Sequence, residues 1–128
     1  MKVDISFIVP LYKGMDYISK KINLLKHMKT KNQIELIFVN DEVDCLVEEK
    51  EERITDNLYV KWIQHKKNEG IHRSRLDGFV TSSGKYICFL DQDDELTEDY
   101  IVSQCRFFQE DAVDAVICNG IWRKTKQI

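Results

Sequence analysis

The stretch Tyr86–Asp94, with the sequence YICFLDQDD, decides the fold and much of the function of this chain. Its first five residues are aromatic, β-branched or otherwise apolar and follow a Ser-Gly breaker, which predicts a short buried strand. Three carboxylates then stand within four residues, at Asp91, Asp93 and Asp94, and they repel one another. A divalent cation such as Mg²⁺ or Mn²⁺ would offset that repulsion, because hard cations prefer carboxylate oxygens. Taken alone, these letters fit a solvated acidic turn equally well.

Length and composition predict one globular domain spanning residues 1–128. The chain is 43% hydrophobic and 32% charged, with a net charge of −3, which does not favour a nucleic-acid partner. We see no signal peptide, no C-x-x-C pair among the four cysteines, and no apolar stretch approaching the roughly 20 residues that span a bilayer. We therefore expect a cytoplasmic protein, with the inner face of the membrane as a second option.

Apolar runs alternate with amphipathic stretches along the chain. They predict strands at 5–9, 34–39, 58–64, 86–90 and 114–119, and helices at 15–29, 43–55, 71–81 and 97–109. This alternation predicts an α/β fold, with a mainly parallel sheet and helices on both faces. Right-handed crossovers place the carboxyl ends of such strands on one edge, where ligands bind. The segments 10–13, 40–41 and 91–94 should therefore converge there.

Four segments, in order, resemble the motifs of inverting family 2 glycosyltransferases, nucleotide-sugar enzymes of the GT-A fold. Ile8–Lys13 (IVPLYK) resembles their Val-Pro-x-Tyr-Asn motif, and Val39–Glu42 (VNDE) resembles Val-Asn-Asp-Gly-Ser. Asn68–Gly78 (NEGIHRSRLDG) resembles Asn-x-Gly-x-x-x-Ala-Arg-Asn-x-Gly. Gly84–Asp94 (GKYICFLDQDD) is similar to Gly-x-Tyr-Ile-x-Phe-Leu-Asp-x-Asp-Asp. One D-x-D motif is weak support, whereas the ordered set from residue 5 to about residue 100 is specific.

The resemblance implies a nucleotide site near the ends of these strands. Pro10 and Tyr12 would form a wall against the base. Asp41 would accept hydrogen bonds from uracil or ribose. The full implied set is Pro10, Tyr12, Asp41, Asn68, Gly70, Arg75 and Asp91. Asn68 and Gly70 would approach the base or ribose, and Arg75 would lie near the diphosphate or order the acidic loop by ion pairing.

The resemblance also implies metal assistance by Mg²⁺ or Mn²⁺. Asp93 would ligate the cation, Asp91 would hold ribose or a metal-bound water, and Asp94 would support the loop. The metal would act as a Lewis acid on the departing nucleoside diphosphate. A UDP-sugar is the first candidate for the donor, and a saccharide or lipid-linked saccharide for the acceptor. Bacterial surface polysaccharide synthesis is the setting that the family suggests.

The sequence departs from the family pattern in ways that concern loop shape and nucleotide preference. Lys13 replaces an Asn, Glu42 and Val43 replace Gly-Ser, Cys45 replaces an acid, and Leu76 replaces an Asn or Asp. Inverting enzymes also need a general base for the acceptor hydroxyl, which in the family comes after the D-x-D motif. Only residues 95–128 follow here, so the catalytic base stays unassigned.

We therefore expect the N-terminal, nucleotide-sugar-binding part of a glycosyltransferase, with the GT-A sheet truncated. Asp111 and Asp114 are candidate bases only because they are present. The alternative is a noncatalytic module that binds nucleotide or a partner protein. A nucleotidyltransferase would want a Gly-rich basic loop after the first strand, which Lys13-Gly14 matches poorly. An exposed last strand at 114–119 would favour self-association.

Overall fold

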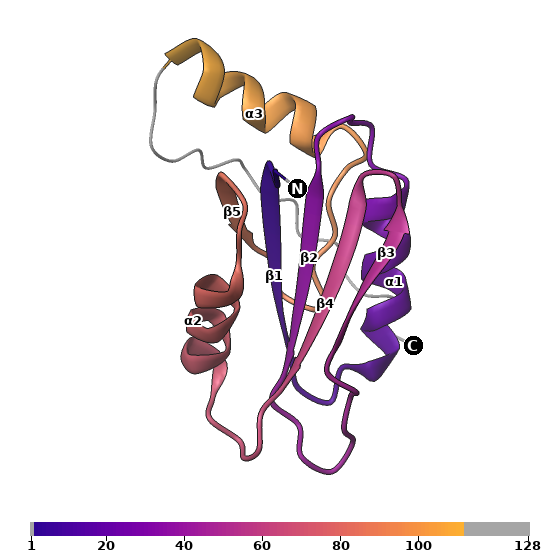
Figure 1. The fold of residues 1–128 in the computed structure, drawn as a ribbon, viewed down its shortest axis with the longest axis vertical. Coiled ribbons are helices and arrows are strands. Elements are labelled where there is room, and N and C mark those ends of the chain that lie inside the picture. Colours follow the sequence, from indigo (N-terminus) through magenta and orange to yellow (C-terminus); the bar gives the residue numbers. More distant parts are fainter. Residues whose placement is uncertain (1, 112–128) are drawn as a thin grey trace, which may run out of the picture.

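The computed structural model describes residues 2–111, which form a sheet flanked by three helices (Figure 1). In chain order the elements are β1 (Ile5–Leu11), α1 (Met15–Lys26), β2 (Ile34–Asn40), β3 (Lys50–Thr55), β4 (Leu58–Gln64), α2 (Ile71–Thr81), β5 (Tyr86–Phe89) and α3 (Tyr100–Asp111). The predicted strand at 114–119, and Asp114 with it, lie outside the described residues. Within residues 2–111, no helix is long and apolar enough to cross a membrane.

The five strands follow the order β3-β4-β2-β1-β5. β1 lies between β2 and β5 and runs parallel to both, and β4 runs parallel to β2. Only β3 is antiparallel, and it pairs with β4 at the edge of the sheet. β1 and β2 are buried along their whole length, which fits their mostly apolar sequences, since a parallel strand is covered on both faces.

Helices cover both faces of the sheet, as the sequence predicted (Figure 1). One face carries the larger core, in which Phe7, Leu36 and Val60 are fully buried together with Leu25 of α1 and Ile101 of α3. α2 contacts β1 and β2, and the smaller core cluster is Ile8, Ile37 and Val39. The mainly parallel α/β prediction is thus confirmed.

The predicted helix at 43–55 is wrong. Residues 41–49 contain no helix, and Lys50–Thr55 forms β3 instead. The charged run of this segment suggested a solvated helix, but it forms an exposed edge strand, in which Glu51 lies opposite Lys61 and Arg53 lies opposite Tyr59. Asp41 is therefore not followed by a helix that it could cap.

Element ends differ by a few residues from those predicted. β1 continues through Pro10 to Leu11, α1 ends at Lys26, and β5 ends at Phe89. α3 begins at Tyr100, because Thr97 forms a turn whose carbonyl accepts the Tyr100 amide at 3.1 Å. In Figure 1, α3 crosses the end of the sheet where β1 begins, away from the carboxyl ends of the parallel strands, and Asp111 is the last residue of this helix.

Candidate functional site

A pocket of about 480 Å³ opens at the carboxyl ends of the parallel strands, beside the start of α2. Figure 1 shows this region at the lower end of the sheet. The pocket is lined by Pro10, Leu11, Tyr12, Asp41, Asn68, Gly70, Ile71, Ser74, Asp91, Gln92 and Asp93. The structure thus brings together all the residues singled out for the site except Arg75, which contacts the pocket through Asp91. Their roles toward a ligand stay predictions.

Asp41 is the most constrained polar group of the pocket. Its side chain is buried, and its carboxylate accepts the Glu69 amide at 2.7 Å, the Gly70 amide at 2.9 Å and the His65 Nδ1 at 2.8 Å. Burial alone would raise the pKa of Asp41, but these three donors outweigh it and the pKa lies below its ordinary value. Asp41 is therefore a carboxylate that holds the loop after β4.

That loop, Asn68–Gly70, needs its glycine for a conformational reason. Gly70 has φ 91° and ψ 169°, a backbone region that is essentially restricted to glycine, while a Cβ there would meet nothing within 4 Å. The family resemblance implied that Gly70 would approach the base or ribose of a nucleotide. The structure adds that this conformation points the Gly70 amide at Asp41.

A second polar cluster fixes the loop that follows β2. The Asn40 Nδ2 donates to the Glu42 carbonyl at 3.2 Å, the Cys45 carbonyl at 2.9 Å and the Gln64 Oε1 at 2.8 Å. Gln64, at the end of β4, in turn donates to the Glu42 carbonyl at 3.1 Å. Glu42, which replaces the family's usual glycine, thus lies in a loop braced by two buried or half-buried amides.

The acidic loop is clasped to the end of β1. The Gln92 side chain accepts the Tyr12 amide and donates to the Tyr12 carbonyl, both at 3.1 Å, in the manner of a strand pair. A Cβ at Gly14 would lie 2.0 Å from the Gln92 Oε1, so the lack of a side chain at residue 14 leaves room for the Gln92 side chain. Arg75 on α2 pairs with Asp91, with 3.0 Å between Nη2 and Oδ1. Of the two roles considered for Arg75, the structure shows the ordering contact.

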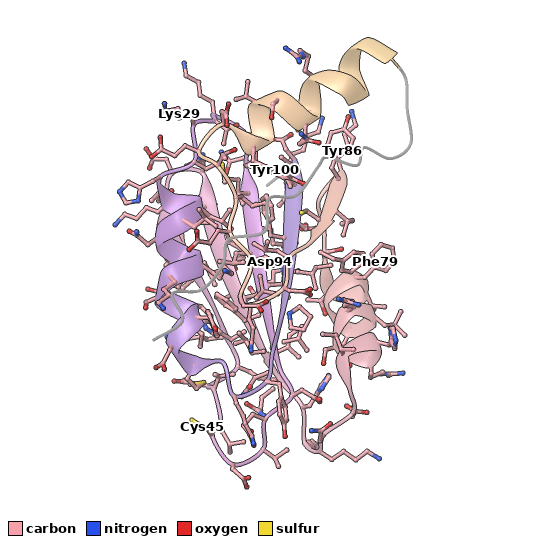
Figure 2. All side chains as sticks on the ribbon, turned by 180° about the vertical axis from the view of Figure 1, so that it is seen from behind. Lys29, Cys45, Phe79, Tyr86, Asp94 and Tyr100 are labelled. Atoms are coloured by element: carbon pink, nitrogen blue, oxygen red, sulfur yellow. The ribbon has the colours of Figure 1, made fainter. Side chains whose placement is uncertain are left out.

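Charge is concentrated where the metal site was predicted. Burial raises the pKa of Asp94, and the neighbouring Asp91 and Asp93 carboxylates raise it further. Lys21 of α1 is 3% exposed, and its ammonium donates to the Asp94 carbonyl oxygen. Figure 2 shows Asp94 on the loop after β5. The carboxylate oxygens of this loop repel one another, and such oxygens are the ligands that a hard divalent cation prefers.

Three residues of the site escaped the sequence reasoning. Gln92 occupies the variable position of the D-x-D motif, and His65 gave no signal of its own. Lys21 did give a signal: it stands three residues after Ile18 and four before Leu25, inside the apolar stripe of α1. A lysine on the buried face of a helix needs a polar partner, and here that partner is the acidic loop.

The chain belongs to Glycosyl transferase family 2, whose sequence profile matches residues 6–127. EpsH of Bacillus subtilis (strain 168), a predicted glycosyltransferase, is 33% identical over 116 residues, which cover 90% of this chain and 33% of EpsH. The glycosyltransferase GlyA of Streptococcus pneumoniae serotype 4 is 30% identical over 122 residues, which cover 90% of this chain and 16% of GlyA. The chain thus spans about a third or less of these two relatives.

The fold is shared with crystal structures of S. aureus TarS. The structure of TarS residues 1–349 superposes with a TM-score of 0.70 at 22% identity, covering 94% of this chain and 39% of that one. A structure of the same fragment in complex with UDP gives a TM-score of 0.69 at 22% identity, covering 94% and 38%. These neighbours support the predicted GT-A architecture.

Proposed function

We propose that this chain forms the donor-binding part of an inverting glycosyltransferase that transfers a sugar from a nucleotide-diphosphate sugar to a hydroxyl acceptor, with a UDP-sugar as the donor. The observation that carries the proposal is the pocket itself. It joins Asp41, the loop at Asn68–Gly70 and the acidic loop at Asp91–Asp93 at the carboxyl ends of parallel strands. The TarS complex with UDP, together with the family membership, supports the choice of nucleotide.

Each part of the pocket has a role that fits its chemistry. Tyr12, with a side chain 46% exposed, offers an apolar ring against a base, and Asp41 offers acceptor oxygens to its polar edge. The backbone amides at the start of α2 lie beside Gly70, where a helix N-terminus favours an anion such as a diphosphate. Arg75 holds Asp91 in place, so that the loop is ordered before a ligand arrives.

A divalent cation, Mg²⁺ or Mn²⁺, would be held by Asp93 and Asp91 and would stabilise the negative charge of the leaving diphosphate. The chain's own residues prepare this arrangement. The Gln92 side chain holds the acidic loop against the Tyr12 backbone, and the Lys21 ammonium holds it by donating to the Asp94 carbonyl oxygen. We assign no residue within 2–111 as the general base.

Calorimetric titration with UDP, GDP and CDP, each with and without Mn²⁺, tests the proposal. We expect Mn²⁺-dependent binding of UDP that is lost in Asp93→Ala. The matched control is Asp56→Ala, which removes an exposed carboxylate from the β3–β4 turn, away from the pocket. Equal binding by Asp93→Ala and wild type, or no binding of any nucleotide, would contradict the proposal. A turnover assay with UDP-sugars separates an active enzyme from the alternative, a noncatalytic binding module.

A further inference from the structure

A histidine outside the predicted site connects the pocket to α2. His65 follows β4 directly, is 5% exposed, and has a carboxylate at hydrogen-bond distance from each ring nitrogen. Its Nδ1 lies 2.8 Å from the Asp41 Oδ1, and its Nε2 lies 2.7 Å from the Asp77 Oδ2. Both neighbours are acceptors when ionised, and both distances are short. The ring therefore bridges the end of β2 and the middle of α2.

The geometry sets the protonation state of this ring. A neutral imidazole carries one N–H, so it could satisfy only one carboxylate and would leave a lone pair facing the oxygen of the other. An imidazolium carries two N–H groups and satisfies both. Three carboxylates face His65. They belong to Asp41 after β2, to Glu69 in the loop after β4, whose Oε2 lies 3.7 Å from the His65 Nδ1, and to Asp77 on α2. Arg73 also pairs with Asp77, with 3.1 Å between its Nε and the Asp77 Oδ1.

We propose that His65 is a positioning residue of the nucleotide pocket: as an imidazolium it ties Asp41 to Asp77 and so holds the Asn68–Gly70 loop in its binding conformation. Asp41 is the common partner, because the same carboxylate receives the Glu69 and Gly70 amides. If His65 loses its proton, Asp41 or Asp77 loses its donor, and the bridge from Asp41 to Asp77 on α2 is broken. The nucleotide part of this inference rests on the proposed function, whereas the loop part does not.

The cluster has one other reading. Ligand atoms of His65, Glu69 and Asp77 lie within 4.8 Å of one another, close enough to surround a metal ion. Both ring nitrogens are already bonded to carboxylates, so a metal would first have to displace one of these bonds. We therefore interpret the cluster as an ion-pair network.

The direction of the pH dependence follows from the environment of His65. Burial alone would lower its pKa, but the hydrogen bonds to Asp41 and Asp77 and the charge of Glu69 raise it above the ordinary 6.5. A group whose pKa is raised on folding contributes its stabilisation at low pH and loses it as the pH rises through the raised pKa. The ordered loop is thus expected below about pH 6.5, and it loosens above that value.

The first experiment follows the free protein by NMR from pH 5.5 to pH 9. We expect the His65 ring to titrate with a midpoint above 6.5, and the Glu69 and Gly70 amide shifts to change with the same midpoint. Asp77→Asn removes one charge while keeping a hydrogen-bonding side chain, and should lower that midpoint by about one pH unit. Glu52→Gln, which removes an exposed charge on β3, should leave it unchanged. A His65 titration midpoint below pH 6.5, or Glu69 and Gly70 amide shifts that do not change with that midpoint, would overturn the proposal.

The second experiment measures UDP affinity over the same pH range. We expect it to fall roughly tenfold as His65 deprotonates, which corresponds to one charge-assisted hydrogen bond. The fall should occur at lower pH in Asp77→Asn, and comparison of the two proteins cancels the titration of the nucleotide itself. A pH-independent affinity in the wild-type protein would overturn the positioning role. Failure to bind UDP at any pH would instead contradict the proposed function, while the amide titration still decides the loop.

Discussion

At the scale of single residues, the pocket depends on backbone amides aimed at one carboxylate. Asp41 has a structural role besides any contact with a nucleotide base, because its carboxylate already accepts hydrogen bonds from the Glu69 and Gly70 amides and from the His65 ring. The Asn-x-Gly motif at Asn68–Gly70 thus binds directly to Asp41 of the Asn-Asp motif. The strand pattern placed Asn40-Asp41 at the carboxyl edge of the sheet, and the family resemblance assigned Asn68 and Gly70 to the same site, but no pattern indicated that the two motifs bind each other.

Gly70→Ala tests this contact. Alanine avoids φ 91° with ψ 169°, so we expect a loss of about 1–3 kcal/mol in the free energy of unfolding, or a local shift that withdraws the amide from Asp41. Either result lowers nucleotide affinity. Thermal unfolding and UDP calorimetry measure the two effects. Lys67→Ala, an exposed neighbour with no positive φ, is the control. Unchanged stability together with unchanged affinity in Gly70→Ala would contradict the prediction.

At the scale of elements, α2 is tied to the sheet by a buried carboxylate at its far end. Glu35 in β2 is 1% exposed and lies 2.9 Å from the Lys61 ammonium of β4. It also accepts the Ser6 hydroxyl of β1 at 2.7 Å, and the amide and hydroxyl of Ser83, which follows α2, both at 2.9 Å. One side chain thus links β1, β2, β4 and the connection from α2 to β5.

Glu35→Gln should destabilise the fold by about 2–3 kcal/mol, because it removes the closer and buried countercharge of the largely buried Lys61 ammonium and leaves only the exposed Glu51, at 4.0 Å. Burial would raise the pKa of Glu35, but Lys61, Ser83 and Ser6 hold it below the ordinary 4.5. A lowered pKa gives stability above about pH 4.5 that is lost as the pH falls through the folded value. The difference between wild type and variant in urea unfolding should therefore be large at pH 7 and shrink below pH 4.5.

The control for Glu35→Gln is Glu52→Gln. Glu52 pairs with Lys50 at 3.7 Å and both side chains are about half exposed, so this substitution should cost less than about 1 kcal/mol at either pH. An equal cost for the two substitutions, or a difference that is the same at pH 7 and at low pH, would show that the Glu35 network does not depend on its charge.

Strands and helices with a strong period were predictable, whereas the β3 edge was not. Apolar runs or a neighbouring glycine indicate four of the elements: β1, β2, α2 and β5. The ends of all four were predicted within about two residues. β3 carries Lys50, Glu51, Glu52 and Arg53, charges that protect an exposed edge but resemble a solvated helix. The available signal was the two-residue turn at Asp56-Asn57 before the alternating strand β4.

At the scale of the whole molecule, the sequence predicted the pocket better than the contacts that shape it. Pro10, Tyr12, Asp41, Asn68, Gly70, Asp91 and Asp93 line one pocket because parallel strands share a carboxyl edge, a rule that needs only topology. The clasp of Gln92, the anchor of Lys21 and the bridge of His65 are tertiary contacts across distances of up to 80 residues. No local period in the sequence encodes such pairings, because they form only when distant segments come together in the fold.

An apolar surface on α2 and β5 bears on self-association of the molecule. Leu76, Phe79 and Val80 share one side of α2 at helical spacing and are 48%, 51% and 73% exposed. Figure 2 shows Phe79 at the outer surface. Phe89 of β5, 51% exposed, pairs in register with Ile8, and so faces the same side of the sheet as α2. Exposed apolar residues gathered in this way are typical of interaction surfaces.

We therefore expect concentration-dependent self-association through this surface. Val80→Lys places a charge at its most exposed apolar position without a cost in helix propensity, so it should shift sedimentation velocity profiles toward monomer and leave the melting temperature nearly unchanged. Val102→Lys is the matched control, since Val102 is an exposed valine, 56% accessible, on α3 rather than on α2. A wild-type protein that stays monomeric at high concentration would contradict the prediction. An equal effect of the two substitutions would place the contact elsewhere.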